Sequence, residues 1–258
     1  MAEQRITRDY HIHTKLCKHA KGEMFEYVET AIEKGLTEIA FTDHIPLPDG
    51  FDAAHRMAES DLEKYVKSIE DLRRQYPQIK IRCGIEADFY DGFEDYLQKT
   101  FARYAFEIII MSVHYVKGWP KNNWAFSFYF PDCSLTAVYS DYLQAVRRGV
   151  ETGLFNVLGH LDLIKRPEQS LLEQNRSEVE EILESCARFN MAVELNTSGL
   201  RKEIGQVYPD LSFMPLVKEA GLPICFGSDA HEPWQVGYRF EDTDNALKAF
   251  PNLTIKTF

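Results

Sequence analysis

The chain has 258 residues, of which 45% are hydrophobic, and a formal net charge of −11. This acidic balance argues against a nucleic-acid backbone as the main partner, because such binding needs clustered Lys and Arg. The longest aliphatic run, residues 108–111, is far shorter than the roughly 20 residues that span a membrane, and the five cysteines form no CxxC pair, so the sequence predicts a reduced, cytoplasmic protein.

Seven short apolar runs alternate with helical patterns along the chain. Runs without polar alternation are typical of parallel strands that are covered on both faces. Strands and helices that alternate to the end of the chain predict an α/β fold. We interpret the pattern as one domain over residues 1–258, a seven-stranded β/α barrel, with an open doubly wound sheet as the alternative. The predicted strands are residues 9–13, 38–42, 79–87, 107–113, 156–159, 191–196 and 223–227.

Helical periodicity lies between these strands. Apolar residues at helical spacing predict helices over 25–32, 62–72, 135–146, 179–183 and 213–220. The sequence also contains signals that start or end helices. These signals are capping boxes at Ser60 with Glu63 and at Ser177 with Glu180, a cap at Ser134, and a terminal glycine at Gly221.

One segment, residues 115–133, is rich in aromatic residues, prolines and asparagines and fits neither pattern. It follows the fourth predicted strand, so we expect a long loop at the mouth of the barrel. Long ordered loops in compact domains are often functional. Two interpretations stay open: a packed lid without ligand contact, or aromatic walls of a substrate pocket.

Histidines and carboxylates stand at the ends of the predicted strands. In a parallel barrel these ends meet at one mouth, where active sites are built. Imidazole and carboxylate ligands suit Zn, Fe and Mn, and these groups outnumber the ligands of one tetrahedral ion. The sequence therefore predicts a site for two or three metal ions. The candidate ligands are His11, His13, His19, His44, Glu86, His114, His160, Asp229 and His231.

A single histidine at a strand end is usually a hydrogen-bonded structural residue. A structural role alone does not explain why six strand ends each carry His, Asp or Glu. His55 lies in a polar stretch and is expected on the surface. Cys17 lies between His13 and His19, and we do not expect its thiolate among so many nitrogen and oxygen ligands.

These residues form motifs that resemble those of the polymerase-and-histidinol-phosphatase (PHP) superfamily, essentially along the whole chain. Within the superfamily the chain is most similar to the monofunctional histidinol-phosphate phosphatases, through CKHA at 17–20, DHIP at 43–46 and NTSGLR at 196–201. The superfamily motifs are DYHIH at 9–13, TDH at 42–44, GIE at 84–86, SVH at 112–114, GHLD at 159–162 and GSDAH at 227–231.

The resemblance implies a distorted (β/α)7 barrel and three divalent metal ions, Zn, Fe or Mn. It implies that Glu86 bridges two of them. The implied ligand sets are His11, His13, Glu86 and Asp229 for the first ion, His19, His44 and His231 for the second, and Glu86, His114 and His160 for the third.

The implied activity is hydrolysis of L-histidinol phosphate to L-histidinol and phosphate in histidine biosynthesis, by a metal-bridging hydroxide. Asp43 is our candidate for the acid that protonates the leaving group; the alternative is a carboxylate that orients a histidine ligand. Arg166 and Arg201 are candidate phosphate ligands, although both could be ordinary surface charges, and Lys18 is a further candidate.

Other functions stay open. A related phosphoesterase acting on nucleotides or on phosphotyrosine protein would use the same ligands. A proofreading exonuclease is disfavoured by the acidic charge, and amide hydrolysis on a related barrel by the lack of a lysine at a strand end. A metal-storing or regulatory protein without catalysis is the alternative outside the enzymes. We expect a small-molecule phosphate ester as the partner, and neither a nucleic acid nor a membrane.

Overall fold

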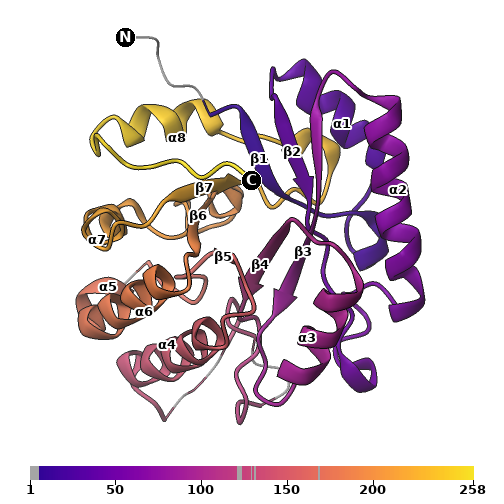
Figure 1. The fold of residues 1–258 in the computed structure, drawn as a ribbon. Coiled ribbons are helices and arrows are strands. Elements are labelled where there is room, and N and C mark those ends of the chain that lie inside the picture. Colours follow the sequence, from indigo (N-terminus) through magenta and orange to yellow (C-terminus); the bar gives the residue numbers. More distant parts are fainter. Residues whose placement is uncertain (1–5, 121–123, 129, 131, 168) are drawn as a thin grey trace.

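The computed structural model describes residues 6–120, 124–128, 130, 132–167 and 169–258. Its seven strands are parallel and neighbour one another in sequence order (Figure 1). The predicted strands agree with these to within a few residues, and the fifth is the shortest. The strands are β1 (Arg8–Ile12), β2 (Glu38–Phe41), β3 (Lys80–Asp88), β4 (Ile108–Ser112), β5 (Val157–Leu158), β6 (Ala192–Asn196) and β7 (Ile224–Gly227).

The ring of strands closes between the first and the last. Ile12 forms a parallel bridge with Ala230, and the backbone NH of His13 donates to the Ala230 carbonyl at 2.9 Å. The register of β1 on β2 shifts between Asp9 and Ile12, so this part of the ring is irregular. The distorted seven-stranded barrel is therefore confirmed, and the open doubly wound sheet is wrong.

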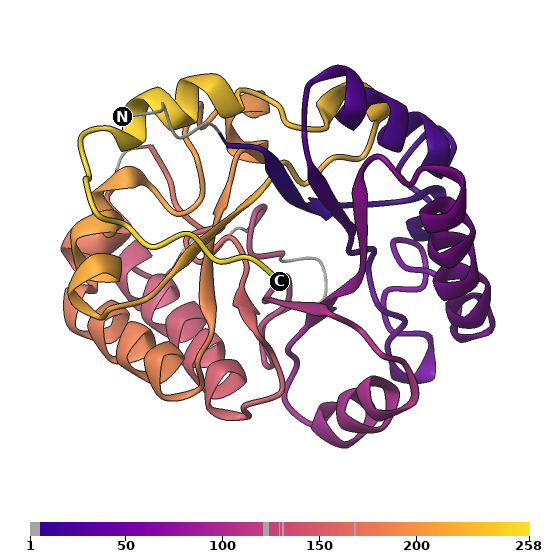
Figure 2. The same ribbon diagram turned by 45° about the horizontal axis from the view of Figure 1, so that its top comes forward.

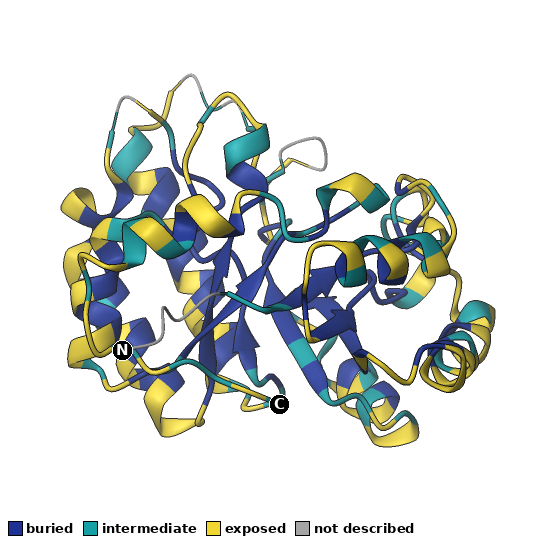
Figure 3. Ribbon diagram, turned by 90° about the horizontal axis from the view of Figure 1, so that it is seen from above, coloured by how far each residue is buried: buried dark blue, intermediate teal, exposed yellow. Residues whose placement is uncertain are grey.

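Helices surround the strands (Figure 2). Their inner faces are buried and their outer faces exposed, whereas the strands are buried almost throughout (Figure 3). Three helices were absent from the prediction, namely α3, α5 and α8. The helices are α1 (Met24–Glu33), α2 (Leu62–Gln75), α3 (Glu94–Arg103), α4 (Leu135–Glu151), α5 (Leu171–Gln174), α6 (Arg176–Arg188), α7 (Met214–Glu219) and α8 (Phe240–Leu247).

Two of the predicted helix signals were right, the cap at Ser134 and the terminal glycine at Gly221. The Ser134 side chain accepts a hydrogen bond from the Ala137 NH at the start of α4. Gly221 has φ of +67° just beyond α7, a left-handed conformation that glycine adopts without strain.

Both predicted capping boxes were wrong, because another helical turn precedes each helix. A 3-10 turn, Glu59–Asp61, leads into α2, and its Asp61 carboxylate accepts from the Ala58 NH. Ser177 lies inside α6, since α5 ends at Gln174 and only Asn175 separates the two helices.

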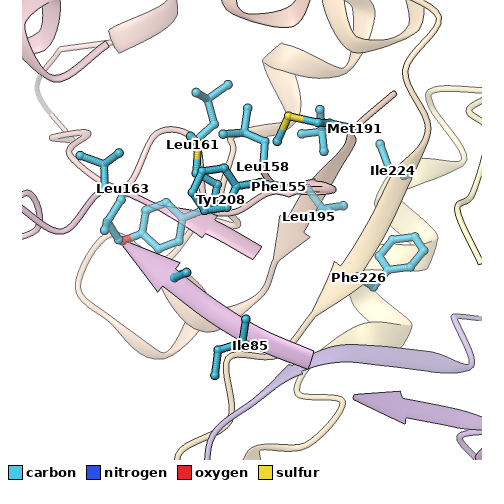
Figure 4. Close-up of a cluster of buried hydrophobic side chains, with 14 of the residues drawn as sticks. Ile85, Phe155, Leu158, Leu161, Leu163, Met191, Leu195, Tyr208, Ile224 and Phe226 are labelled. Carbon is cyan, nitrogen blue, oxygen red and sulfur yellow. The ribbon is translucent and has the colours of Figure 1, made fainter. Parts of the chain in front are cut away.

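The main core lies between strands and helices. Side chains from β5, β6 and β7, including Leu158, Leu195 and Phe226, belong to one buried cluster with Met191 and Tyr208 (Figure 4). Burial of this kind supplies most of the stability of such a fold. It fixes the strands whose ends carry the candidate ligands.

The C-terminal residue packs at the opposite end of the barrel from the strand C-termini. Ile255 bridges Ile224, the first residue of β7, and the Phe258 ring lies 5.1 Å from the Tyr10 ring in an edge-to-face contact. Phe258 packs on a small buried cluster drawn from six strands. The cluster contains Tyr10, Ala40, Ile108, Ile110, Val157, Ala192 and Cys225.

Replacing Phe258 by alanine is expected to lower the free energy of unfolding by about 1–2 kcal/mol, because a half-buried ring and one aromatic contact are lost. Activity at 25 °C should not change, since the candidate ligands lie at the other end. Urea denaturation measures the effect, with Phe25→Ala at the 42% exposed ring on α1 as the control. An equal loss in both variants would contradict the packing role.

Candidate metal centre

Glu86 occupies the middle of the candidate site. It lies near the end of β3 and is only 1% exposed. Its Oε2 atom lies 2.9 Å from His44 Nδ1, 3.4 Å from His11 Nε2 and 3.5 Å from His13 Nε2. One carboxylate oxygen thus faces three imidazoles that come from the ends of β1 and β2.

The other oxygen of Glu86 faces a different pair of histidines. Its Oε1 atom lies 3.0 Å from His160 Nε2 and 3.9 Å from His114 Nε2, and it accepts a hydrogen bond from Ser112. The two oxygens of this carboxylate therefore serve separate groups of imidazoles. This is the arrangement that a bridging ligand requires.

Asp229 joins the group formed by β1. Its Oδ1 atom lies 3.1 Å from His13 Nε2, 4.0 Å from His11 Nε2 and 3.4 Å from His231 Nδ1. Asp229 has φ of +53°, a left-handed conformation that is uncommon for a residue with a side chain. Backbone strain of this kind clusters at functional sites.

Three histidines form a further group at the rim. The Nε2 atoms of His19 and His231 lie 2.9 Å apart. With His44 they offer nitrogen atoms that all lie within 4.8 Å of one another. His11, His13 and Asp229, three of the four residues of the first expected set, meet the same distance.

The buried atoms of this site need a partner. Among the described residues no hydrogen bond of suitable geometry is formed by several buried atoms, although some lie close to one another. These atoms are His11 Nε2, both ring nitrogens of His13, His44 Nδ1, His160 Nδ1 and Glu86 Oε2. Buried polar atoms are normally hydrogen-bonded, so this concentration at one place calls for an explanation. Divalent metal ions, which take imidazole nitrogen and carboxylate oxygen as ligands, fit these atoms.

The protonation states of two residues also suit metal binding. Burial by itself raises the pKa of Glu86, but the imidazoles of His44 and His11 hold that pKa well below its usual range. Burial lowers the pKa of His44 to about 4. A carboxylate anion and a neutral imidazole are the forms that bind a cation.

Glu194 is a functional residue that the sequence interpretation missed. This carboxylate of β6 is 1% exposed, lies 2.5 Å from His11 Nδ1 and accepts from the His160 NH at 3.0 Å. A Cβ at Gly227 would lie 2.1 Å from the Glu194 carboxylate, so glycine is needed there. The available signal was a charged residue inside the apolar run AVELN.

Asp88 and Arg56 were missed as well. Asp88 lies 3.0 Å from His114 Nδ1, and the buried guanidinium of Arg56 donates to Asp88 and lies 3.1 Å from Asp52. Burial by itself raises the pKa of Asp88, but the Arg56 charge beside it holds that pKa well below its usual range. A carboxylate on the second ring nitrogen orients a histidine for metal binding.

Asp43 lies beside the Nδ1 atom of His13, as Asp88 lies beside that of His114. It is fully buried, its Oδ1 atom lies 3.4 Å from His13 Nδ1, and its Oδ2 atom accepts from the side chain and backbone NH of Thr14. Asp43 does not line the cavity described below. This placement favours the orienting role over the acid.

A cavity of about 560 Å³ opens onto the ligands. Trp124 and Phe126 of the aromatic segment line it, in agreement with the interpretation of aromatic walls, whereas Tyr129 lies outside the described residues. His55 also lines the cavity, and its side chain is 42% exposed, in agreement with the expected surface position. Its Nδ1 atom lies 2.6 Å from the Asp52 carboxylate.

The Arg201 guanidinium lies behind Asp229. Its two terminal nitrogens donate to the carbonyls of Ser228 and Asp229 at 2.9 and 2.8 Å. Arg201 thus braces the backbone of a candidate ligand. Because a guanidinium carries five N–H donors, these contacts leave others for a phosphate.

Arg166 and Lys18 contact residues other than the candidate ligands. The Arg166 guanidinium stacks 4.3 Å from the centre of the Phe128 ring, and the Lys18 ammonium donates to the Ala53 carbonyl. Like Arg201, neither side chain lines the cavity. The Cys17 thiol lies 3.9 Å from His19 Nε2, and burial raises its pKa, which keeps it in the neutral form.

A closed ring of parallel strands with buried imidazoles and carboxylates at its C-terminal mouth defines a metal-binding β/α barrel protein. The model of the PHP domain family matches residues 9–198, and that of the PHP-associated family matches residues 215–245. The chain belongs to the PHP domain family. The resemblance seen in the sequence motifs is therefore confirmed.

Relatives cover the chain from end to end. A "Probable histidinol-phosphatase" of Deinococcus radiodurans is 34% identical, over 96% of this chain and 95% of that protein. A "Histidinol-phosphatase" of Bacillus subtilis is 33% identical, over 91% and 97%. The crystal structure of histidinol phosphate phosphatase from Lactococcus lactis, complexed with zinc, L-histidinol and phosphate, is 22% identical with a TM-score of 0.83, over 98% and 97%.

Among the described residues no helix is long and apolar enough to cross a membrane.

Proposed function

We propose that this chain is a metal-dependent phosphatase that hydrolyses L-histidinol phosphate to L-histidinol and phosphate in histidine biosynthesis. The observation that carries the proposal is the convergence of five imidazoles on the two oxygens of Glu86. The identity of 33–34% to two histidinol-phosphatase relatives supports this substrate over nucleotides or phosphotyrosine protein.

We further propose three divalent ions, Zn, Fe or Mn, in the ligand sets implied by the sequence. When bound there, such ions activate water and offset the negative charge of the phosphoryl group. Glu194 and Asp88 then hold the imidazoles of His11 and His114 in the orientation that binds metal. The cytoplasmic location stays a prediction.

Arg201 and Arg166 remain our candidates for phosphate binding, and the case is stronger for Arg201. Arg201→Ala is expected to lower kcat/KM about 10- to 100-fold, because charge-assisted hydrogen bonds to phosphate and to the Asp229 backbone are lost. Steady-state kinetics measures the loss, and Arg201→Lys should recover part of it. Unchanged KM and turnover in Arg201→Ala would contradict the assignment.

Asp43→Asn is expected to weaken metal binding about 10- to 100-fold, as is typical when the partner of a ligand histidine is changed. The reason is that Asp43 faces His13 and not the cavity. Metal content per chain after dialysis, measured together with turnover, tests this. Low turnover at full metal content would instead favour the role of proton donor.

The proposed activity is tested by phosphate release from L-histidinol phosphate, beside a panel of nucleotides and a phosphotyrosine peptide. Protein is assayed as purified, chelated, and reconstituted with Zn, Mn or Fe. A metal-dependent preference for L-histidinol phosphate is expected. A preference for another ester would keep the metal centre and reject the substrate, and absence of turnover in fully metallated protein would favour a binding protein.

A further inference from the structure

A second cavity, of about 550 Å³, adjoins the metal cavity. Asp52 and Trp124 line both cavities. A cavity of this size is large enough for a small organic molecule. No candidate metal ligand lines it.

Three mouth loops build this cavity, and half of its lining residues are aromatic. The loops follow β2, β3 and β4, so the cavity lies at the same end of the barrel as the metal centre. The aromatic side chains of the wall are Phe51, Tyr90, Phe93, Tyr115, Trp119 and Trp124.

These rings support one another. The Phe51 ring lies 4.9 Å from Tyr90, 5.7 Å from Phe93 and 5.1 Å from Tyr115, and Tyr115 lies 4.8 Å from Trp124. Aromatic pairs at such distances attract one another beyond the effect of burial. The wall is therefore formed before any ligand enters.

The charge of the wall is negative. Asp49 and Asp52 line it, and the described lining residues include no Lys, Arg or His. Asp52 is already engaged by His55 and Arg56 on the side of the metal cavity. Asp49 is exposed and forms no hydrogen bond or ion pair recorded among the described residues, so its charge is available to a ligand.

We propose that this second cavity binds a small organic cation, a molecule that carries an ammonium group. The faces of aromatic rings attract cations, most strongly when the ring is an indole, and Trp119 and Trp124 supply two. The Asp49 carboxylate adds a Coulombic attraction, and the same charges exclude a phosphate. L-Histidinol phosphate also carries an ammonium group, but the inference concerns a cation that has no phosphate, and its test does not depend on the proposed function.

The probe is benzyltrimethylammonium, because a quaternary ammonium group can neither coordinate a metal nor donate a hydrogen bond. Its binding to the metal-loaded protein is measured by isothermal titration calorimetry, with benzyl alcohol as the neutral comparison. The cation is expected to bind at least about tenfold more tightly than the alcohol. Saturating inorganic phosphate should leave the affinity unchanged.

Two variants test the wall. Trp119→Ala is expected to weaken binding about tenfold and Asp49→Asn about threefold. The matched control is Trp234→Ala, since Trp234 is 53% exposed and does not line the cavity, and its affinity should equal that of the unaltered protein. Asp49 is exposed, so Asp49→Asn keeps the test valid if Trp119→Ala unfolds.

Equal binding of the alcohol would overturn the proposal, and so would competition by phosphate. An affinity that Asp49→Asn leaves unchanged would overturn it as well, whether or not Trp119→Ala folds. The measurement requires no turnover. A protein that binds the probe but hydrolyses no histidinol phosphate would therefore reject only the proposed function, and the reverse result would reject only the second site.

Discussion

Replacing Glu86 by glutamine is expected to lower kcat/KM about a thousandfold and to reduce the bound metal by at least one ion per chain. Glutamine keeps the shape of the side chain but removes the charge that faces five imidazoles. Losing one partner of a buried charge cluster costs about 3–5 kcal/mol, which corresponds to roughly a thousandfold in an equilibrium constant.

The measurement combines metal analysis with the kinetics of phosphate release. Glu184→Gln is the matched control, because Glu184 is exposed on α6, away from the candidate ligands, and the same chemical change should leave both readouts unaltered. Full metal content and full activity in Glu86→Gln would show that this carboxylate does not bridge metal ions.

The candidate ligands could be predicted because each one follows a local signal. His44 and His114, for example, come directly after apolar runs, and parallel strands bring such positions to one mouth. The prediction required no knowledge of which side chain contacts which. The same argument explains why the barrel was predicted, since strand and helix patterns are also local.

The partners of the ligands could not be predicted in this way. Glu194 contacts His11, which is 183 positions away in the sequence, and it stands as a single charged residue in an apolar run just before the NTSGLR motif. Asp52 and Arg56 stand in a polar stretch that is typical of a surface loop, yet their ion pair is buried beside the cavity. Contacts of this kind depend on how loops pack, which periodicity does not report.

Removal of the metal ions is expected to abolish activity and to lower the melting temperature by about 10 °C. Ions that bind only the folded chain stabilise it by about 4 kcal/mol when their concentration is a thousand times the dissociation constant. In a chain of this size, 1 kcal/mol corresponds to about 2–4 °C. Without the ions, the buried ring nitrogens of His11 and His13 lack the metal partners that we assign to them.

Thermal unfolding before and after treatment with a chelator, and again after addition of Zn, Mn or Fe, measures the shift. Glu86→Gln provides the control, because a variant that has already lost metal should respond less to the chelator. A chelated protein with unchanged melting temperature and activity would contradict the metal centre. Lost activity at an unchanged melting temperature would mean that the barrel holds its buried imidazoles in place without the ions, so that the metals serve the chemistry alone.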